Sequence, residues 1–586
     1  MSKPVHTKVF IGQHEKFQTV SYSIKATQKM AQHQELELSY SESAKNSNFT
    51  QEIVNLVGLP FRLEIWELQE RTVAITSKLL LEYQGVVTDV SIIKEDQSQP
   101  EVLIFVKSPT ELLTHGKDSM SFEKETLVNI IREATKGYPN GLVEVDANPR
   151  FTDVIPYTVQ YKESDFDFMC RLAKRYGEWF YYDGTMLRFG APSSKDPVIL
   201  TIGAGFDVFT FKAKSRAQNY SYLGYDYQAA KVHTSSMKEE YMQSKNPYID
   251  KVMRASKNLY AKEPLGSYNN SSLEGGQKEL SNVVKLKTQA AHNMLYVKGE
   301  SDNEQVTLGG LISIKGKNIN DPSKEEVYGT YIITAFSYKI SKDKQYENNF
   351  EGVPKEIDVP DYYDEDAIPL SEEQFAVVTD NNDPKGMGRV RVGFPWQAKN
   401  GGKSPWIRLA TSHAGAGKGF YFIPEIGEEV LVGFEGGNAE NPYVIGTRYN
   451  SKQKTPVNDP AQKIIQTRSG NKIVLNDADG SVFISDNGKA SIKMDGAGNI
   501  EVNAEKMIKF SVCGKKGAYG IVDENGDISF NAENRISLGV NGNGVQIDSE
   551  GNVIVTGDNV QIHGKKTTTV HGKTTVDVTG DKVKIN

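Results

Sequence analysis

Glycine and lysine at residues 415–419 have the composition of a phosphate-binding loop, but not its spacing. The stretch reads GAGKG. A loop of the form G-x-x-x-x-G-K-[ST] would need a glycine at Ser412 and a hydroxyl residue at Gly419 to hold Mg²⁺. A dinucleotide loop, G-x-G-x-x-G, would need a glycine at Phe420. We therefore predict that these glycines shape a loop that enters a strand, because residues 420–437 are aromatic and typical of β-structure.

Histidine and carboxylate spacings predict no catalytic or metal centre. The nine histidines form no H-x-H, H-x-x-x-H or H-E-x-x-H pattern. His563 and His571 could each form a ring of three imidazoles around a three-fold axis, but solvated histidines at turns are the favoured interpretation. Glu428 and Glu429 are neighbours on a predicted strand, so their side chains point to opposite faces. No nucleophile elbow or Cys/His pattern is evident. We expect no enzyme, no metal and no cofactor.

Composition limits the classes of protein and partner. The chain has 586 residues and a net charge of −7. This length predicts about three to five domains, and the acidic balance argues against general nucleic-acid binding. Two cysteines are too few for a disulfide scaffold. The N-terminus lacks a signal peptide's apolar core, and no apolar run reaches the roughly 18 residues of a membrane helix. Cytoplasmic synthesis is the simplest expectation, with export by a dedicated machine.

Two kinds of periodicity organise the first 350 residues. Residues 35–41 and 61–68 alternate apolar and polar side chains, which predicts half-buried antiparallel strands. Residues 123–138 carry apolar side chains at helical spacing, with Gly137 as the predicted C-terminal cap. A second helix is predicted after Ser164 or Asp165, ending at Gly177, followed by a hairpin through Asp183 and Gly184. The less regular 240–285 stretch is expected to hold a helical excursion.

A segment rich in Pro, Asp and Glu, 351–374, predicts a domain boundary. About five short strands joined by Gly, Asn and Pro turns follow, a length that suits a small Greek-key barrel of the OB type. Trp396 and Trp406 lie in this segment. They could stack on a sugar or a base, but packing of the barrel and of contacts between chains is the favoured interpretation.

The last ~120 residues repeat short strands and glycine turns. Glycines 557, 564, 572 and 580 are 7, 8 and 8 residues apart. The repeat contains Val555, Gly557, Ile562, Gly564, Val570, Gly572, Val578 and Gly580. One such unit buries almost nothing and leaves both strand edges unpaired. A period near eight also suits a single-chain β-helix poorly. We therefore predict a three-chain β-prism, with inward Val and Ile, rather than a disordered tail.

These residues together resemble the valine-glycine repeat protein G (VgrG) family. Its members are the spike proteins of bacterial type VI secretion and are related to contractile-phage baseplate spikes. Residues 163–182 are similar to the acidic-aromatic helix of the family's hub domain. The OB motif is carried by Gly388, Arg389, Phe394, Pro395, Trp396, Trp406, Gly417, Gly419, Pro424 and Gly427, with Val390, Arg408, Lys418, Glu429, Val430, Phe434 and Pro442 in the family's order.

The resemblance implies a mainly β fold in three parts. Residues 1–360 would form a phage baseplate hub-like domain with two β-barrel subdomains and a few helices. Residues 372–450 would form the OB-fold domain. Residues 460–586 would form a trimeric β-helical spike shaft. Only about 15 residues separate Tyr449 from the first shaft-like strand, so we expect no inserted lysozyme domain there.

The resemblance also implies partners. The chain would form a homotrimer, dock on an Hcp-like tube protein and baseplate components, and carry effector proteins or adaptors. A PAAR-type tip protein would bind Val583, Lys584, Ile585 and Asn586. The target membrane would be met only mechanically, and no nucleic acid is expected. The spike would be cytoplasmic before firing, and extracellular or inside a target cell afterwards.

Three alternatives stay open at this point. The chain could be the spike of a phage tail or of an extracellular contractile injection particle, which the sequence alone does not separate from a secretion spike. An enzyme-bearing, wall-degrading spike is a weaker alternative, because the chain length leaves no catalytic domain. A trimeric adhesin is weaker still, because neither an export signal nor an anchor is evident.

Overall fold

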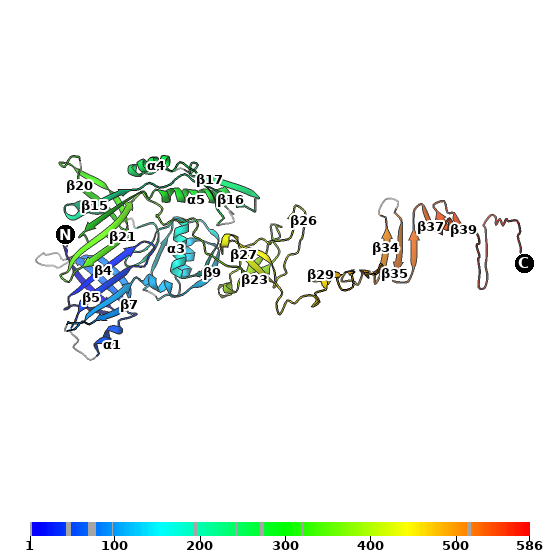
Figure 1. Cartoon of the computed structure of the whole chain (residues 1–586), viewed down its shortest axis with the longest axis horizontal. Helices are drawn as coiled ribbons and strands as arrows, with labels where there is room; N and C mark the ends of the chain where they lie inside the picture. The colour runs from blue at the N-terminus through cyan, green and yellow to red at the C-terminus, as the bar shows by residue number, and fades with distance from the viewer. Residues whose placement is uncertain are drawn as a thin grey trace. The chain divides into compact units, whose positions relative to one another are not determined.

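A computed structural model of the chain describes residues 3–42, 48–67, 78–96, 98–139, 141–192, 196–240, 243–269, 275–318, 320–512 and 517–585 (Figure 1). The chain divides into two units, Met1–Arg448 and Tyr449–Asn586. The described residues form many strands and five α-helices, so the prediction of a mainly β fold is confirmed. None of the described helices is both long enough and apolar enough to cross a bilayer.

Six strands of the first unit close into a β-barrel. Each strand pairs with the next, and the pairing of β21 with β22 completes the ring. The strands, in ring order, are β22 (Gln345–Pro354), β19 (Leu295–Ser301), β15 (Gly205–Ala213), β14 (Val198–Ile202), β20 (Leu311–Lys317) and β21 (Glu325–Ile340).

A second set of strands continues from the other edge of β21. The order is β4 (Tyr22–Lys29), β5 (Glu35–Ser41), β8 (Glu101–Lys107), β7 (Lys78–Ile93), β6 (Pro60–Glu67), β2 (His6–Ile11) and β3 (His14–Lys16). The short strand β1 (Lys3–Pro4), just before β2, pairs with β22. This set therefore also connects back to the first barrel at both ends.

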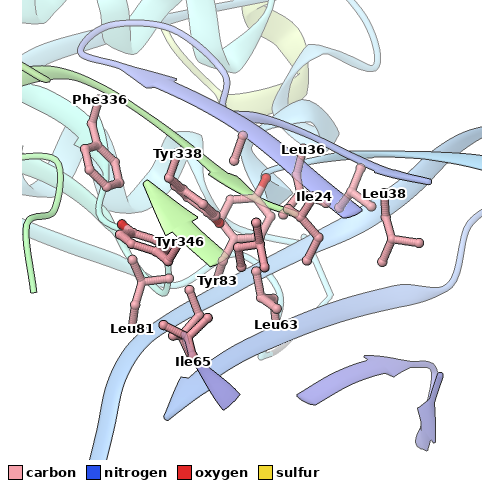
Figure 2. Packing of buried hydrophobic residues seen from close by; sticks show 14 of the residues in the cluster. Ile24, Leu36, Leu38, Leu63, Ile65, Leu81, Tyr83, Phe336, Tyr338 and Tyr346 are labelled. Carbon is pink, nitrogen blue, oxygen red and sulfur yellow. The ribbon is translucent and has the colours of Figure 1, made fainter. Parts of the chain in front are cut away.

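The alternating apolar residues of the sequence are the buried residues of the second set of strands. Leu36, Leu38 and Tyr40 on β5 are buried, and the residues between them are not. These side chains point into one apolar cluster that runs through both strand sets (Figure 2). Figure 2 shows Tyr83, Tyr338 and Tyr346 gathered at its centre. Aromatic side chains of this size supply much of the apolar area that such a core buries.

The predicted helices and hairpin are present, with one correction. Helix α3 (Asp165–Tyr176) begins at the N-cap Ser164 and ends at Gly177, which has φ +66°. The hairpin follows as β12 (Phe180–Tyr182) and β13 (Leu187–Gly190). Helix α2 (Leu127–Ala134) is capped by Thr135 instead of Gly137. The hydroxyl of Thr135 donates to the carbonyl of Ile131, so the helix ends before the glycine is reached.

The remaining elements of the first unit are small sheets and helices outside the two large strand sets. Strands β9 (Asp118–Glu125) and β11 (Ile155–Glu163) pair, as do β10 (Val145–Asn148) and β13. A small sheet of β16 (Ser221–Asp226), β17 (Lys231–Ser236) and β18 (Leu265–Ser267) lies against helix α5 (Gly276–Ala291). Helix α4 (Pro247–Leu259), with α5, confirms the predicted helical excursion, and α1 (Phe49–Val54) is a short surface helix.

The OB domain forms a small barrel with its own core. Strands β24 (Arg391–Gly393), β23 (Gln374–Asp380), β27 (Glu429–Phe434) and β28 (Pro442–Thr447) pair in that order. Ile407 bridges to Val390 and Leu409 bridges to Val444, so the segment 407–409 joins the two edges. The predicted fifth strand is therefore reduced to two bridges. A short hairpin, β25 (Ala414–Gly415) and β26 (Lys418–Gly419), leaves this barrel.

The second unit, the tail, consists of three antiparallel sheets in sequence order. The first holds β29 (Gln462–Gln466), β30 (Lys472–Asn476), β31 (Ser481–Ser485), β32 (Ser491–Met494) and β33 (Ile500–Asn503). The second holds β34 (Met507–Ser511), β35 (Tyr519–Asp523) and β36 (Ile528–Asn531). The third holds β37 (Arg535–Val540), β38 (Asn543–Asp548) and β39 (Val553–Thr556). Residues 557–585 form no strand within one chain.

Candidate functional site

The first tail sheet carries a continuous apolar face. Residues that pair directly across antiparallel strands lie on the same face. Ile473 pairs with Ile484, Ile484 with Ile492, and Ile492 with Val502. A parallel row pairs Leu475 with Val482, Val482 with Met494 and Met494 with Ile500. Strands β30–β33 therefore present one apolar surface, which Ile465 of β29 extends by pairing with Ile473. The opposite face is apolar at Ile464, Val474 and Phe483 and becomes polar at Lys493 and Glu501.

The other two tail sheets repeat this arrangement. In the second sheet, Val522 pairs with both Ile508 and Ile528. In the third, Ile547 pairs with Ile536 and Val553, and Val545 with Leu538 and Val555. The exposed fractions of these side chains reach 65% at Ile528 and Val553. Each sheet thus has one face made of branched apolar residues that the single chain leaves open.

No described residue of the tail is buried in the single chain, from Tyr449 to Ile585. A sheet is stable only when its apolar face packs on a second layer. Contiguous exposed apolar surface of this extent marks an interface. The tail faces are therefore the first candidate functional surface, and their chemistry is that of packing against another β-layer.

Aspartates anchor the turns between tail strands. The Oδ1 of Asp495 accepts hydrogen bonds from the backbone amides of Ala497 (2.7 Å) and Asn499 (3.0 Å). Asp523 and Asp548 accept from the amides two and four residues later in the same way. The third residue after each aspartate is a glycine, and Gly498, Gly526 and Gly551 all have positive φ. The D-x-x-G-[ND] spacing is present in the sequence, although we predicted only glycine turns there.

These hydrogen bonds change the acidity of the turn carboxyls. Hydrogen bonds from Asn499 and from the backbone amides of Asn499 and Ala497 lower the pKa of Asp495 to about 2. Hydrogen bonds from Asn552, through its side chain and its backbone amide, likewise lower the pKa of Asp548. Because both groups bond in the ionised form, the turns are built around charged aspartates.

The residues of the C-terminal repeat lie fully open in one chain. Val555 is on β39, whereas Ile562, Val570 and Val578 lie beyond the last strand with exposed fractions of 75%, 73% and 67%. The glycines of the repeat, Gly557, Gly564, Gly572 and Gly580, lie in the same segment. His563 is exposed and lies 3.2 Å from the Oε1 of Gln561, and His571 is exposed too.

The four residues predicted to bind a tip protein end the chain. Val583, Lys584 and Ile585 are exposed, with Ile585 89% exposed. Asn586 lies outside the described residues. Nothing within one chain covers the described three, so they are available to a partner that packs on the end of the tail.

The OB motif residues lie in the barrel core and its loops. Arg389 forms a bidentate ion pair with Asp383, its terminal nitrogen 2.7 Å from Oδ1 and its Nε 3.0 Å from Oδ2. This pairing holds the pKa of the Asp383 carboxyl well below its usual range. Both side chains are buried, so the ion pair holds the loop of residues 381–389 against the barrel.

The aromatic members of the motif stack where the barrel meets the hub. The ring of Phe394 is buried and lies 5.4 Å from the ring of Trp396. Pro395 begins the short 3-10 helix that carries Trp396. The indole nitrogen of Trp396 donates to Gln374 (2.8 Å), and its ring lies 6.0 Å from the hub residue Tyr161. The structure thus places Trp396 at the hub–barrel contact.

The glycines and the proline of the motif shape its loops. Gly388, Gly417, Gly419 and Gly427 all have positive φ. At Gly419 a Cβ atom would stand 2.4 Å from the carbonyl oxygen of His413, so a larger residue would break the hairpin. Pro424 is buried, and its carbonyl accepts a hydrogen bond from the side chain of Asn381 (3.0 Å).

A buried ion-pair network joins the barrel to hub helix α3, and the sequence had not indicated it. Glu440, on the barrel, is 4% exposed and pairs with Arg175 and, at 3.5 Å, with Arg171. The hydroxyl of Thr158 on β11 donates to the same carboxylate (2.5 Å). Burial alone would raise the pKa of Glu440, but the two arginines outweigh it and the pKa is lowered. The only feature of the sequence that could have pointed to this network is the spacing of Arg171 and Arg175, which lie four residues apart on one helix face.

Further contacts make this junction continuous. Gln397 donates to the hydroxyl of Ser121 (2.7 Å), Arg391 pairs with Glu123, and Lys399 lies 3.2 Å from Asp118. A cleft of about 540 Å³ opens beside the junction, and Trp406 is one of its lining residues. The hub and the OB barrel are thus tied along strand β9, strand β11 and helix α3.

Burial keeps two titratable side chains of the hub protonated. Burial raises the pKa of the Cys170 thiol to about 12, so this cysteine stays protonated. Burial likewise raises the pKa of Tyr157, which lies at the hub–barrel junction, above its ordinary value. Within the described ranges no group of three or more His, Cys, Asp or Glu side chains is arranged to hold a metal ion.

Two family models match the chain. Residues 51–344, half of the chain, match the phage tail baseplate hub (GPD) family. Residues 374–449 match the type VI secretion system/phage-baseplate injector OB domain. Neither match reaches the strands of the tail.

Two similar proteins of known name are spike proteins. The type VI secretion system spike protein VgrG1b of Pseudomonas aeruginosa is 27% identical over 396 residues, which is 62% of this chain and 50% of that protein. VgrG1a of the same organism is 26% identical over 388 residues, or 62% and 58%. The chain spans about half the length of the curated relatives it matches.

A solved structure extends the likeness of fold. A chain of the lidless PdpA–VgrG complex superimposes with a TM-score of 0.50 at 9% identity, covering 90% of this chain and 98% of that chain. At this identity the match shows the fold alone.

Proposed function

This chain belongs to the phage tail baseplate hub (GPD) family, its relatives confirm the VgrG resemblance of its sequence, and on that premise we propose that it is the membrane-puncturing spike of a contractile injection apparatus of the type VI secretion kind. Three copies assemble around one axis. The hub seats the spike on the apparatus, the OB barrels form a collar, and the tail is the needle.

One observation carries the proposal: every described residue of the tail is unburied in a single chain, although its three sheets each present an apolar face. Burying one Val or Ile side chain stabilises a fold by about 1.5–3 kcal/mol, and the tail leaves more than a dozen open. Copies of the same chain supply the missing layers when three such faces meet. The repeat after Thr556 then finds strand partners that one chain does not provide.

The hub–barrel junction supports a mechanical role. A spike driven outward must pass force from its seat to its needle without bending at the joint. The buried network of Glu440 with Arg171 and Arg175 holds the barrel on helix α3, and the Gln397 and Arg391 contacts hold it on strand β9. Two domains joined by buried ion pairs resist separation, because separating them would leave buried charges without their partners.

The proposed partners follow from the ends of the spike. An Hcp-like tube protein and baseplate components contact the hub, and a PAAR-type tip protein covers Val583 to Asn586. Effector proteins or adaptors travel with the assembled spike. A VgrG relative forms a complex with PdpA, which supports partner binding as a property of such spikes.

The function we propose involves no covalent chemistry. The relatives VgrG1b and VgrG1a are named as spike proteins, and the two matched family models describe a hub and an injector domain. The spike waits in the cytoplasm and reaches the exterior or a target cell on contraction. A spike of a phage tail is the second candidate, because the OB family description covers both kinds of apparatus.

Native mass spectrometry of the full chain, with electron microscopy of the same sample, tests the proposal. We expect the mass of three 65.1 kDa chains and a three-fold particle with a needle. A folded monomer at micromolar concentration would refute the spike. Secretion of the chain into the medium by a strain with an intact contractile sheath, lost when the sheath is deleted, separates the secretion spike from a phage part.

A further inference from the structure

An aromatic loop of the OB domain projects without a partner. Residues 411–422 are all exposed. The loop ends in three consecutive aromatic residues, Phe420, Tyr421 and Phe422, with exposed fractions of 58%, 80% and 60%. Each aromatic side chain of this kind can bury about 150–250 Å². Three exposed in succession form a patch of the size that marks an interaction site. Figure 1 shows the loop, labelled at β26, extending beyond strands β23 and β27.

The loop is held in one conformation. Its hairpin pairs Ala414 with Gly419 and Gly415 with Lys418. The amide of Phe420 donates to the carbonyl of His413 (3.0 Å), and the hydroxyl of Thr411 donates to the carbonyl of Phe420 (3.1 Å). The buried Pro424 fixes the return to the barrel. The aromatic side chains are therefore presented on a preorganised arm, which lowers the entropy cost of docking them.

A second apolar surface of the same domain is also open. On strand β23 the side chains of Phe375 and Val377 point away from the barrel core and are 53% and 40% exposed. Phe375 pairs across the strands with Leu431. Phe375 and Leu431, with Pro395 and Trp396, line a groove of about 460 Å³. This volume falls in the range of sites that bury a ligand group, about 300–1,000 Å³.

Charge favours the match between the two surfaces. Lys418 lies at the base of the aromatic triplet, and residues 411–424 contain no acidic side chain. The groove is bordered by Glu372 and Glu373 and by Arg448. Glu372 already pairs with Lys162, so Glu373 is the carboxylate that faces an incoming lysine. Opposite charges at the rim of an aromatic contact set its register and speed its formation.

We propose that the Phe420–Phe422 loop of one copy packs into the β23 groove of a second copy of this chain. The inference rests on the proposed function, because the tail brings the copies together. The first tail strand begins at Gln462, and the chain from Arg448 to that point spans at most about 50 Å when extended. The barrels of copies joined by their tails therefore lie within reach of one another. A loop of one copy in a groove of the next is a head-to-tail contact, which closes into a ring.

The test uses the full chain with a benzophenone photocrosslinking residue in place of Tyr421. Trimers are assembled from isotopically light and heavy chains, irradiated, and digested for mass spectrometry. We expect light–heavy crosslinks that join position 421 to residues 373–377 or to Leu431. The same crosslinker at Val54, which is 54% exposed on helix α1, is the control and is expected to give no crosslink to the groove.

A charge reversal provides a second readout that does not depend on the crosslinker's fit. Lys418→Glu is expected to lower the crosslink yield about two- to five-fold, the effect of one exposed ion pair, and Glu373→Lys in the same chain is expected to restore it. If native mass spectrometry shows a trimer but no crosslink reaches the groove, or crosslinks form only elsewhere, this contact is refuted. The proposed spike function is then unaffected. A monomer overturns both proposals.

Discussion

At the scale of the residue, a few buried charges determine whether hub and barrel act as one body. Glu440 is the only carboxylate that we find in contact with both Arg171 and Arg175 among the described residues. We had predicted neither the glutamate nor its partners, because residues 440 and 175 are far apart in sequence and only the fold brings them together. The OB motif glycines, in contrast, could be recognised from the sequence, since positive φ restricts such positions to glycine.

Glu440→Gln removes the carboxylate that pairs with Arg175 and one of the two that pair with Arg171, whose other partner is Glu163. Because the substitution breaks a buried ion pair, we expect the hub–barrel unit to lose about 3–5 kcal/mol of stability. Urea unfolding followed by tryptophan fluorescence measures the change, since Trp396 lies at the junction. Glu435→Gln is the matched control: Glu435 pairs with Arg408 on the same barrel, but both side chains are 44% exposed, and we expect a loss of at most about 1 kcal/mol. Equal losses in the two variants would contradict the role assigned to Glu440.

The aspartate turns predict an acid limit for the tail. The carboxyl pKa values of Asp495 and Asp548 are lowered in the folded chain. Ionisation of these two groups therefore stabilises the fold above the ordinary pKa near 3.8, and that stability is lost as pH falls through the folded value. For Asp495 the window runs from about pH 4 to about pH 2.

Asp495→Asn with Asp523→Asn and Asp548→Asn tests that limit. We expect the triple variant to melt at a lower temperature than the wild type at pH 7 and to lose less on acidification to pH 3. Circular dichroism at the β-sheet wavelength records both melts. Glu501→Gln, on a strand instead of a turn, is the control and is expected to melt as the wild type does. An unchanged melting temperature of the triple variant at pH 7 would show that the turns do not need these charges.

At the scale of the element, the alternation of apolar and polar residues predicted strands of the hub, and capping residues predicted helix α3. Leu36, Leu38 and Tyr40 alternate with polar residues because one face of the strand is buried. One-sided burial of this kind makes a strand predictable from the sequence. The connection of the second strand set to the first barrel through β1 and β22 was not predictable, because it depends on pairing across more than 300 residues. The fifth OB strand was over-predicted, since residues 407–409 form bridges with both edges but no continuous ladder.

Neighbouring residues on strand β32 test which face of the tail is buried in the assembly. Ile492 lies on the apolar face and Lys493 on the opposite face. Ile492→Asp places a charge where three copies are expected to meet, so we expect loss of the trimer, measured by light scattering after size exclusion. Lys493→Asp makes an equally large change on the outer face and is expected to leave the trimer intact. A trimer that survives Ile492→Asp would mean that this face is not the interface.

At the scale of the whole molecule, the two units differ in how much apolar surface a single chain buries when it folds. The unit Met1–Arg448 has buried clusters of its own in the hub and in the barrel. The unit Tyr449–Asn586 has regular hydrogen bonding but no buried side chain among its described residues. Backbone pairing alone does not offset the loss of chain entropy, which is why we propose that copies of the same chain complete this unit. The eight-residue glycine spacing led to the same prediction from the sequence, because one unit of that length cannot enclose a core.

The mass of the intact, untruncated chain in native solution tests the central claim most directly. We predict three copies per particle down to nanomolar concentration, with the three tails protected from hydrogen exchange over residues 462–556. A particle of one copy whose tail amides exchange freely would contradict the account, since it would show that the apolar faces of the needle have no partner.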